Sequence, residues 1–268
     1  MHVDTPHHAW KPKIDCIEAR SVPGSHLPLI RLEGTAEVGC ADADFAAVLA
    51  ASRRLTDLLA NLEAAGKRYC IFGGWLRDTL AARICGTPAP RDVDLVVAGI
   101  EVEALIAVLP ADVRPTMFGG VQSPADPVPF DIWPLHETFL IRRLSMPVSF
   151  ESLLRTADFN INTALYFPAQ AGSAPAILDG GMLGGIQGRR LSFNAGQIPF
   201  PVMQCARVLA YGAKLDLSYD APVLGFLREI LDSPASRTEI IEGLRRFQPR
   251  SVAEKAIAAI RPIMDIGI

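Results

Sequence analysis

The sequence predicts a mixed α/β (α+β) fold, in which a small mixed sheet with flanking helices is followed by a region of helices alone. Through most of the chain before Phe200, short apolar runs bounded by glycine or proline alternate with apolar residues at helical spacing. Beyond Phe200 only the helical pattern remains. We therefore expect an N-terminal arm over 1–35, a mixed domain over 36–195 and a helical region over 196–268.

Composition narrows the class of protein. Hydrophobic residues make up 50% of the chain, which is enough for a sizeable core. A net charge of -3 gives no overall positive field, so a nucleic-acid partner would have to bind at a local patch of positive charge. The five scattered cysteines contain no C-x-x-C pair, which argues against a disulfide framework or a zinc site and favours a reduced, cytoplasmic protein. The sequence indicates neither a signal peptide nor a membrane span.

The first predicted elements surround a glycine pair. Residues 1 to about 27 are rich in Pro, His and Gly and are expected to pack irregularly or fray. Apolar residues at helical spacing predict one amphipathic helix over 42–65, with Gly66 as its stop signal. The run 68–72 reads as a buried strand, and a helix begins near Trp75.

The remaining elements of the mixed domain are shorter. Residues 91–97 combine β-branched residues with a period-two pair of carboxylates and predict a second strand. The other predicted elements are a helix over 101–109, strands over 128–133 and 139–143, a helix over 152–165 and a short strand over 176–179.

The strongest chemical signal is the glycine pair followed by two aspartates. Gly73 and Gly74 at a strand-to-helix turn let backbone N–H groups approach a phosphate, and the helix N-terminus adds a favourable dipole. Asp92 and Asp94 alternate along a strand and so point to one face. Such carboxylates suit Mg²⁺, which can activate a hydroxyl for attack on a nucleoside triphosphate.

Each of these pieces alone has a common structural explanation. A Gly-Gly pair is usually only a turn, an isolated D-x-D is mostly a solvated strand edge, and Arg77-Asp78 can be a surface pair on a helix. Their joint occurrence in this order and spacing is much more specific. Arg77 and Asp78 are therefore also interpreted as bracing the glycine turn and reaching the triphosphate, so that both belong to the predicted nucleotide-binding residues.

At these residues the sequence resembles the class II CCA-adding enzymes and bacterial poly(A) polymerases, within the polymerase-β-like nucleotidyltransferases. The head domain of that family carries G-G-x-x-R-D-x-L followed by D-x-D, matched here by Gly73, Gly74, Arg77, Asp78, Leu80, Asp92 and Asp94. The resemblance covers roughly residues 65–215. It implies that 36–195 is a nucleotidyltransferase head domain and that 196–268 is neck-like.

Two further motifs resemble the family less completely. In the family's R-R-D-F-T-I-N-A-L segment, Asp158 and Asn162 carry over, but both arginines are missing and Arg155 is the nearest substitute. In the base-reading E-D-P-x-R-x-x-R segment only Arg207 survives. Gln204 can hydrogen-bond a base edge but lacks the charge and fork geometry of arginine. The resemblance therefore implies nucleotide binding through Asp158, Asn162 and Arg207, with altered base selection.

A third catalytic carboxylate normally lies on a neighbouring strand in this superfamily. Asp131 is the best candidate, because apolar residues flank it on a predicted strand; a simple edge-strand residue is the competing interpretation. Asp126 and Glu137 are poorer candidates. His136 is interpreted as a surface or packing residue, since no second histidine has ligand spacing.

The resemblance implies an NTP substrate, ATP or CTP, with a two-metal Mg²⁺ site and an RNA acceptor, the 3′ end of a tRNA. Little of the chain corresponds to the family's body and tail, which leaves a small molecule or a protein open as the acceptor. A catalytically silent domain is a third hypothesis, disfavoured because paired carboxylates repel each other without a metal. No membrane partner is expected, and the oligomeric state stays open.

The C-terminal helices carry many cations among apolar residues. Such side chains can follow a phosphate backbone. A solvated helix face interleaved with glutamates is the interpretation we favour for the set Arg228, Arg237, Arg245, Arg246, Arg250 and Lys255.

Overall fold

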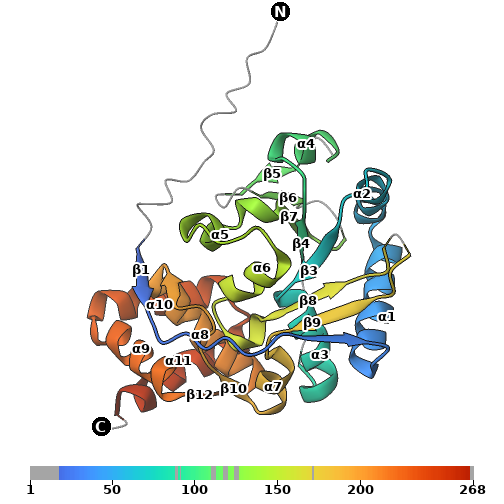
Figure 1. Cartoon of the computed structure of the whole chain (residues 1–268). Coiled ribbons are helices and arrows are strands. Elements are labelled where there is room, and N and C mark those ends of the chain that lie inside the picture. The colour runs from blue at the N-terminus through green and yellow to red at the C-terminus, as the bar shows by residue number, and fades with distance from the viewer. Residues whose placement is uncertain are drawn as a thin grey trace, which may run out of the picture.

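The computed structural model describes residues 18–87, 90, 92–109, 113–116, 120–123, 127–170 and 172–265. Across these residues, eight strands form one sheet in the order β2-β9-β8-β3-β4-β7-β6-β5 (Figure 1). β4 and β7 are parallel, whereas the other neighbours are antiparallel. The strand bounds are β2 Ile30–Glu33, β3 Tyr69–Phe72, β4 Val93–Val97, β5 Arg114–Pro115, β6 Val121–Ser123, β7 Phe130–Pro134, β8 Ala164–Phe167 and β9 Ala176–Asp179. The predicted mixed sheet is confirmed.

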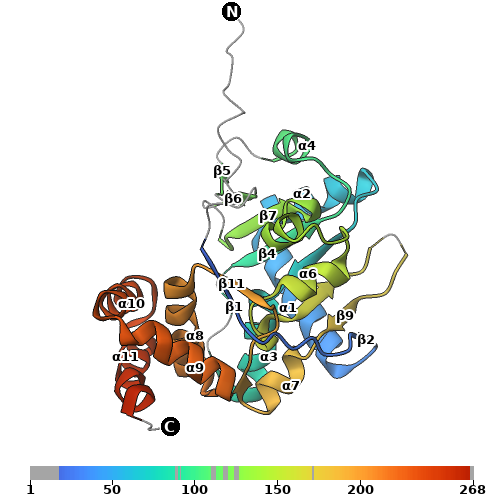
Figure 2. The same cartoon turned by 60° about the vertical axis from the view of Figure 1, so that its left-hand side comes forward.

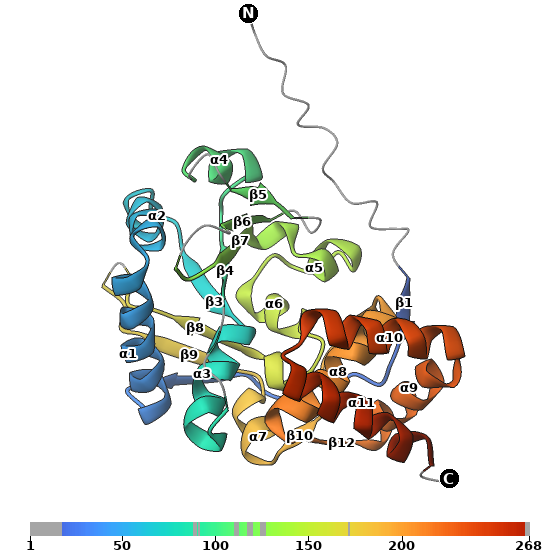
Figure 3. The same ribbon diagram turned by 180° about the vertical axis from the view of Figure 1, so that it is seen from behind.

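Helices cover both faces of this sheet (Figure 3). Because side chains alternate along a strand, Ile71 joins the core with α1 to α3, whereas Cys70 joins the core with α6. On β4, Leu95 faces the first core and Val96 the second, so Asp94 faces the side of Val96. The helices of this domain are α1 Ala36–Ala51, α2 Arg53–Ala64, α3 Gly74–Cys85, α4 Val102–Ala107, α5 Phe139–Arg143, α6 Phe150–Thr156 and α7 Met182–Gln187, with 3-10 turns at Leu135–Glu137 and Asn160–Asn162.

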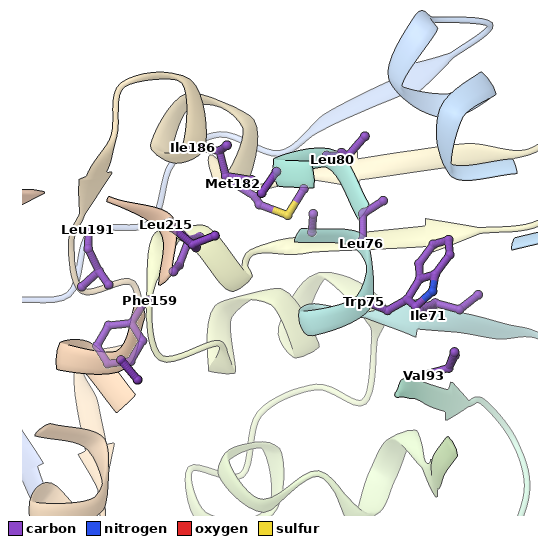
Figure 4. Close-up of a cluster of buried hydrophobic side chains, with 14 of the residues drawn as sticks. Ile71, Trp75, Leu76, Leu80, Val93, Phe159, Met182, Ile186, Leu191 and Leu215 are labelled. Atoms are coloured by element: carbon purple, nitrogen blue, oxygen red, sulfur yellow. The ribbon is translucent and has the colours of Figure 1, made fainter. Parts of the chain in front are cut away.

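The C-terminal region is a helical bundle beside the sheet (Figure 2). It comprises α8 Pro201–Leu215, α9 Ala221–Asp232, α10 Pro234–Phe247 and α11 Arg250–Asp265, with α8 packed against the other three. Leu215 of α8 shares a buried core with Phe159 and Leu191, which ties the bundle to the sheet domain (Figure 4). A two-residue strand, β12 Ser218–Tyr219, pairs with β10 Arg190–Leu191 at the same junction. The boundaries at residues 35 and 195 remain predictions.

No helix in the described part of the chain combines the length and the apolar character that crossing a membrane requires.

The predicted single helix over 42–65 is wrong, because two helices meet at Ser52. The Ser52 backbone closes α1 by donating to the Val48 carbonyl, and its hydroxyl caps α2 by accepting from the Leu55 N–H at 3.1 Å. The apolar spacing continues across the break, which is why periodicity alone suggested one element. The end of α2 just before Gly66, where φ is +65°, agrees with the predicted stop.

Two other predicted elements are also corrected. Residues 139–143 form the helix α5 rather than a strand, with Leu140 and Ile141 buried and the two arginines partly exposed. The helix expected over 152–165 ends at Thr156. Beyond it, the Asp158 carboxylate accepts from the Phe159 N–H at 2.9 Å, a local bond that competes with helical hydrogen bonding, and β8 follows.

The N-terminal arm is more ordered than its composition predicted. β1 (Ala19–Ser21) pairs antiparallel with β11 (Gln197–Pro199), directly before α8, and β2 extends the main sheet beside β9. Arg20 forms an ion pair with Glu229 of α9 at 2.8 Å. Residues 1–17 of the predicted arm lie outside the described residues.

Replacing Gly24 with alanine is expected to destabilise the protein by about 1–3 kcal/mol, a typical cost of overpacking. A Cβ at this position would lie 2.7 Å from the Asn194 carbonyl oxygen and 2.7 Å from the Gly196 nitrogen, both of which are backbone atoms. Urea unfolding measures the effect. Gly39→Ala is the matched control, since nothing lies within 4 Å of its added Cβ; an equal loss in both variants would contradict the close packing of this segment.

Candidate active site

The glycine turn places the start of α3 against a carboxylate. Gly73 ends β3 and has φ of +56°, a left-handed value that glycine adopts without strain. A Cβ on Gly74 would lie 3.5 Å from Oδ2 of Asp94 and 3.9 Å from Nη2 of Arg77. The first turn of α3 therefore offers its free N–H groups beside one anionic and one cationic side chain.

Three carboxylates gather at the β4–β7 pair. Asp94 and Asp131 are register partners on these parallel strands, and Asp92 directly precedes β4. Burial, together with the charges of Asp92 and Asp131, raises the pKa of Asp94 to about 7. Burial also raises the pKa of Asp131. The three side chains are thus close enough to repel one another.

The Asp92/Asp94 pair suits a metal ion that receives its remaining ligands from substrate and water. Among the described residues, no three acidic, histidine or cysteine side chains are grouped as a complete metal site. Mg²⁺, however, is commonly held by one or two carboxylates together with substrate phosphates and water. Asp92 and Asp94 supply hard oxygen ligands and an excess of negative charge beside the phosphate-binding turn. They fit a magnesium ion that arrives with a triphosphate.

Arg77 is the centre of a buried polar network. It is 6% exposed, donates from Nε to Asp78 at 2.8 Å and from Nη1 to the side-chain Oδ1 of Asn162 at 2.6 Å. Its guanidinium also lies 4.6 Å from the Tyr211 ring centroid. Lys214 donates to the other Asp78 oxygen at 2.7 Å, which links α3 to α8. This network joins the sheet domain to the helical bundle.

The contribution of Asp78 to stability is expected to fall at acid pH. Burial opposes its ionisation, but the charges and hydrogen bonds of Arg77 and Lys214 outweigh burial and lower its pKa. A pKa lowered by folding contributes stability above the unfolded value of about 4, and this contribution is lost as the pH falls through the folded value. In urea unfolding, the difference between the native protein and Asp78→Asn should be largest at pH 7 and shrink towards pH 3; a difference independent of pH would contradict this account.

The segment after α6 continues the network towards α8. Asp158 accepts from Nδ2 of Asn162 at 2.7 Å through Oδ1, and its Oδ2 lies 2.7 Å from Nη1 of Arg207. Arg207 also donates to Gln204 at 3.1 Å and to the Tyr211 hydroxyl at 2.8 Å. Burial opposes ionisation of Tyr211, yet the charges of Arg207 and Arg77 lower its pKa. Asn162 thus bridges Arg77 to Asp158.

These groups line one cavity of about 570 Å³ between the sheet domain and α8. Of the predicted site residues, the following line it: Gly73, Gly74, Arg77, Asp78, Asp92, Asp94, Asp158, Asn162 and Arg207. Asp131 does not line the cavity; it is the register partner of Asp94 on the neighbouring strand β7. The structure therefore brings the predicted residues together, while their roles remain predictions.

Sequence reasoning missed part of the α8 wall. Gln204, Arg207, Tyr211 and Lys214 recur at intervals of three or four residues and face the same cavity. Tyr211 and Lys214 were not singled out, although this polar stripe on an otherwise apolar helix was a readable signal.

The poorer candidates for the third carboxylate and for the missing arginines do not line this cavity in the described part of the chain. Glu137 is buried and hydrogen-bonded to Arg142, and His136 lies within 3.5 Å of Glu137 and 3.4 Å of Glu101; neither lines the cavity. Asp126 lies outside the described residues. Arg155 lines a different, smaller pocket and does not replace the family's missing arginines here.

No protein-family model and no curated protein sequence matches this chain. Solved structures do match its fold. A CCA-adding enzyme in complex with ATP gives a TM-score of 0.61 at 14% identity, covering 87% of this chain and 55% of that one. The Thermotoga maritima CCA-adding enzyme complexed with tRNA gives 0.59 at 14% identity, covering 87% and 54%. The chain therefore shares the fold of these CCA-adding enzymes.

A tRNA nucleotidyltransferase complexed with a primer tRNA and an incoming ATP analogue is also similar, with a TM-score of 0.57, 18% identity and coverage of 79% of this chain. Our chain spans 54% to 63% of the length of these three CCA-adding and tRNA nucleotidyltransferase chains. At such low identity the likeness is one of fold. The activity of the chain must therefore be argued from its own cavity.

Proposed function

We propose that this chain is a metal-dependent nucleotidyltransferase, which transfers a nucleoside monophosphate from an NTP to a hydroxyl acceptor and releases pyrophosphate. One observation carries the proposal: the glycine turn at the start of α3, the Asp92/Asp94 pair and the polar stripe of α8 line the same cavity. Phosphate-binding, metal-binding and base-binding groups are thus available to one bound nucleotide.

The phosphate end of the nucleotide lies at the glycine turn. Backbone N–H groups at the start of α3 and Nη2 of Arg77, which is near Gly74, would bind the triphosphate. Asp78 and Asn162 keep Arg77 in this orientation through its other nitrogens. A cation held in this position can stabilise the negative charge that develops on the leaving pyrophosphate.

The metal would be held by Asp92 and Asp94, with Asp131 assisting from the next strand. When bound, Mg²⁺ supplies activation of the attacking hydroxyl and neutralisation of the phosphate charge, in a one- or two-ion arrangement. Asp158, Asn162 and Arg207 would face the sugar and base, since they line the same cavity between the glycine turn and α8.

RNA is the acceptor we favour, and specifically a tRNA 3′ end. The support is the fold shared with proteins that were solved with tRNA, with ATP and with CTP. The chain covers little more than half of those proteins, so a small-molecule or protein acceptor is the alternative. A silent binding domain is the third possibility; three mutually repelling carboxylates at a phosphate-binding turn argue against it.

Labelled nucleotides test the proposal. The purified protein is incubated with each labelled NTP, Mg²⁺ and total RNA, beside the Asp92→Ala/Asp94→Ala variant. Label that enters RNA only with the native protein supports transfer to RNA. NTP turnover that depends on the carboxylates but leaves RNA unlabelled indicates another acceptor, and no turnover or binding favours the silent domain.

A further inference from the structure

β2 is the outermost strand at one end of the main sheet (Figure 2). It covers Ile30–Glu33 and pairs with β9 along one side. Among the described residues, the backbone of β2 bonds to no segment other than β9. A strand edge of this kind presents a row of unpaired N–H and C=O groups and is able to pair with a further strand.

The hydrogen bonds of β9 alternate between its two neighbours. At the end of β9, the Gly180 N–H donates to the Thr163 carbonyl, beside β8, at 2.7 Å. Because hydrogen-bonded pairs alternate along an antiparallel ladder, the preceding residue, Asp179, bonds in the opposite direction, towards β2. The residue opposite it on β8 agrees, since the Ala164 carbonyl faces β3 and accepts from the Gly73 N–H at 3.1 Å.

This alternation determines which backbone groups of β2 face outward. Ile30 is the register partner of Asp179, so Ile30 bonds to β9, and Leu32, two residues further on, does the same. The N–H and C=O groups of Arg31 and Glu33 therefore point to the open edge. Their side chains are 49% and 55% exposed.

The charges on this edge are complementary to those of an identical strand. When two β2 strands pair antiparallel with the two-fold axis at Leu32, Arg31 of each copy lies opposite Glu33 of the other. These are the residues whose backbone groups face outward, so each pair exchanges N–H···O=C bonds and also joins opposite charges. An axis moved to Arg31 or to Glu33 would instead place like charges opposite each other. Charge therefore specifies one register.

We propose that the open edge of β2 is an interface at which two copies of this chain pair to form one continuous sheet. Charged residues on an edge strand often prevent pairing, but here their order favours an identical partner. Leu32 packs against the core that includes α1 to α3, and Ile30, on the same face, is 55% exposed. In the paired register Ile30 lies diagonally next to Leu32 of the other copy, which covers this exposed apolar side chain.

Sedimentation equilibrium of the full-length protein at low salt tests this interface. The native protein should show a reversible monomer–dimer equilibrium. Arg31→Glu places two carboxylates opposite each other in both pairs and should raise the dissociation constant by at least about 10-fold. Arg261→Glu is the matched control, because Arg261 is 91% exposed on α11 and pairs with Asp265 of the same helix. It should leave the dissociation constant unchanged.

A mixture of two charge variants tests the register itself. Glu33→Arg has the opposite defect, with two arginines facing each other in both pairs. When Arg31→Glu and Glu33→Arg chains are mixed in equal amounts, each pair in the mixed dimer again joins opposite charges. The mixture should therefore dimerise about as tightly as the native protein, although neither variant does so alone.

Arg31→Pro tests the backbone pairing separately. Proline removes an N–H that faces outward and leaves the bonds to β9 in place, so dimerisation should be lost while the circular dichroism spectrum stays native. If this variant does not fold, the charge variants decide the matter.

Three results would overturn the proposed interface. They are a native protein that stays monomeric up to about 1 mM, a dimer that survives Arg31→Glu, and a mixture of the two charge variants that stays monomeric. Ile30, Arg31, Leu32 and Glu33 do not line the catalytic cavity, so any of these results would leave the proposed function standing.

Discussion

Asp94→Asn is expected to lower the rate of nucleotidyl transfer by about 1,000-fold, which corresponds to about 4 kcal/mol of lost transition-state stabilisation. Asp94 lines the cavity, lies beside the start of α3 and pairs in register with Asp131. Asparagine has nearly the same shape, but it lacks the charge that attracts a divalent cation. Single-turnover transfer with saturating NTP and Mg²⁺ measures the effect.

The same variant should not unfold the protein. Asp94 lies among the charges of Asp92 and Asp131, so its neutralisation removes repulsion. Asp44→Asn is the control, because Asp44 is a carboxylate of α1 that pairs with Arg83 and does not line the cavity. A fall in rate of less than about 10-fold in Asp94→Asn, or an equal fall in both variants, would contradict a metal-binding role for Asp94.

Arg77→Met is expected to lower the free energy of unfolding by about 3–5 kcal/mol, the usual cost of breaking a buried ion pair. The substitution leaves Asp78 with Lys214 as its one cationic partner among the described residues, and it removes the donor to Asn162. Because this network joins α3 to α8, its loss should also loosen the cavity and weaken NTP binding. Urea unfolding and calorimetry measure the two effects.

Arg83→Met is the matched control on the same helix. Arg83 pairs with Asp44 on the surface and its side chain is 49% exposed, so its loss should destabilise the protein far less than the loss of Arg77. Similar losses of unfolding free energy in the two variants would show that the buried arginine matters no more to stability than the exposed one. Such a result would contradict the role assigned to the Arg77 network.

Much of the cavity could be predicted because its chemistry is local in sequence. The glycine pair adjoins a strand and a helix within a few residues, and the pattern along 91–97 predicted the strand β4, Val93–Val97, which carries Asp94. Two of the failures involve a side chain that bonds to nearby backbone. The Ser52 hydroxyl caps the new helix α2, and the Asp158 carboxylate bonds to the Phe159 N–H just beyond the end of α6, whereas the apolar pattern alone would continue a helix through both positions.

The rest of the site depends on contacts between distant segments. Nothing near Lys214 in the sequence indicates that it meets Asp78, and the orientation of Gln204 follows only from its contact with Arg207 and, through that arginine, with Asp158. The strand β1 is similar, because its pairing partner β11 lies far along the chain. Such partners are set by tertiary packing, which one sequence does not reveal.

A crystal structure of the protein with Mg²⁺ and a non-hydrolysable NTP analogue tests the central claim most directly. The account predicts magnesium bound to Asp92 and Asp94 and phosphates at the first turn of α3. A triphosphate bound away from Asp92, Asp94 and the glycine turn would contradict the proposed site.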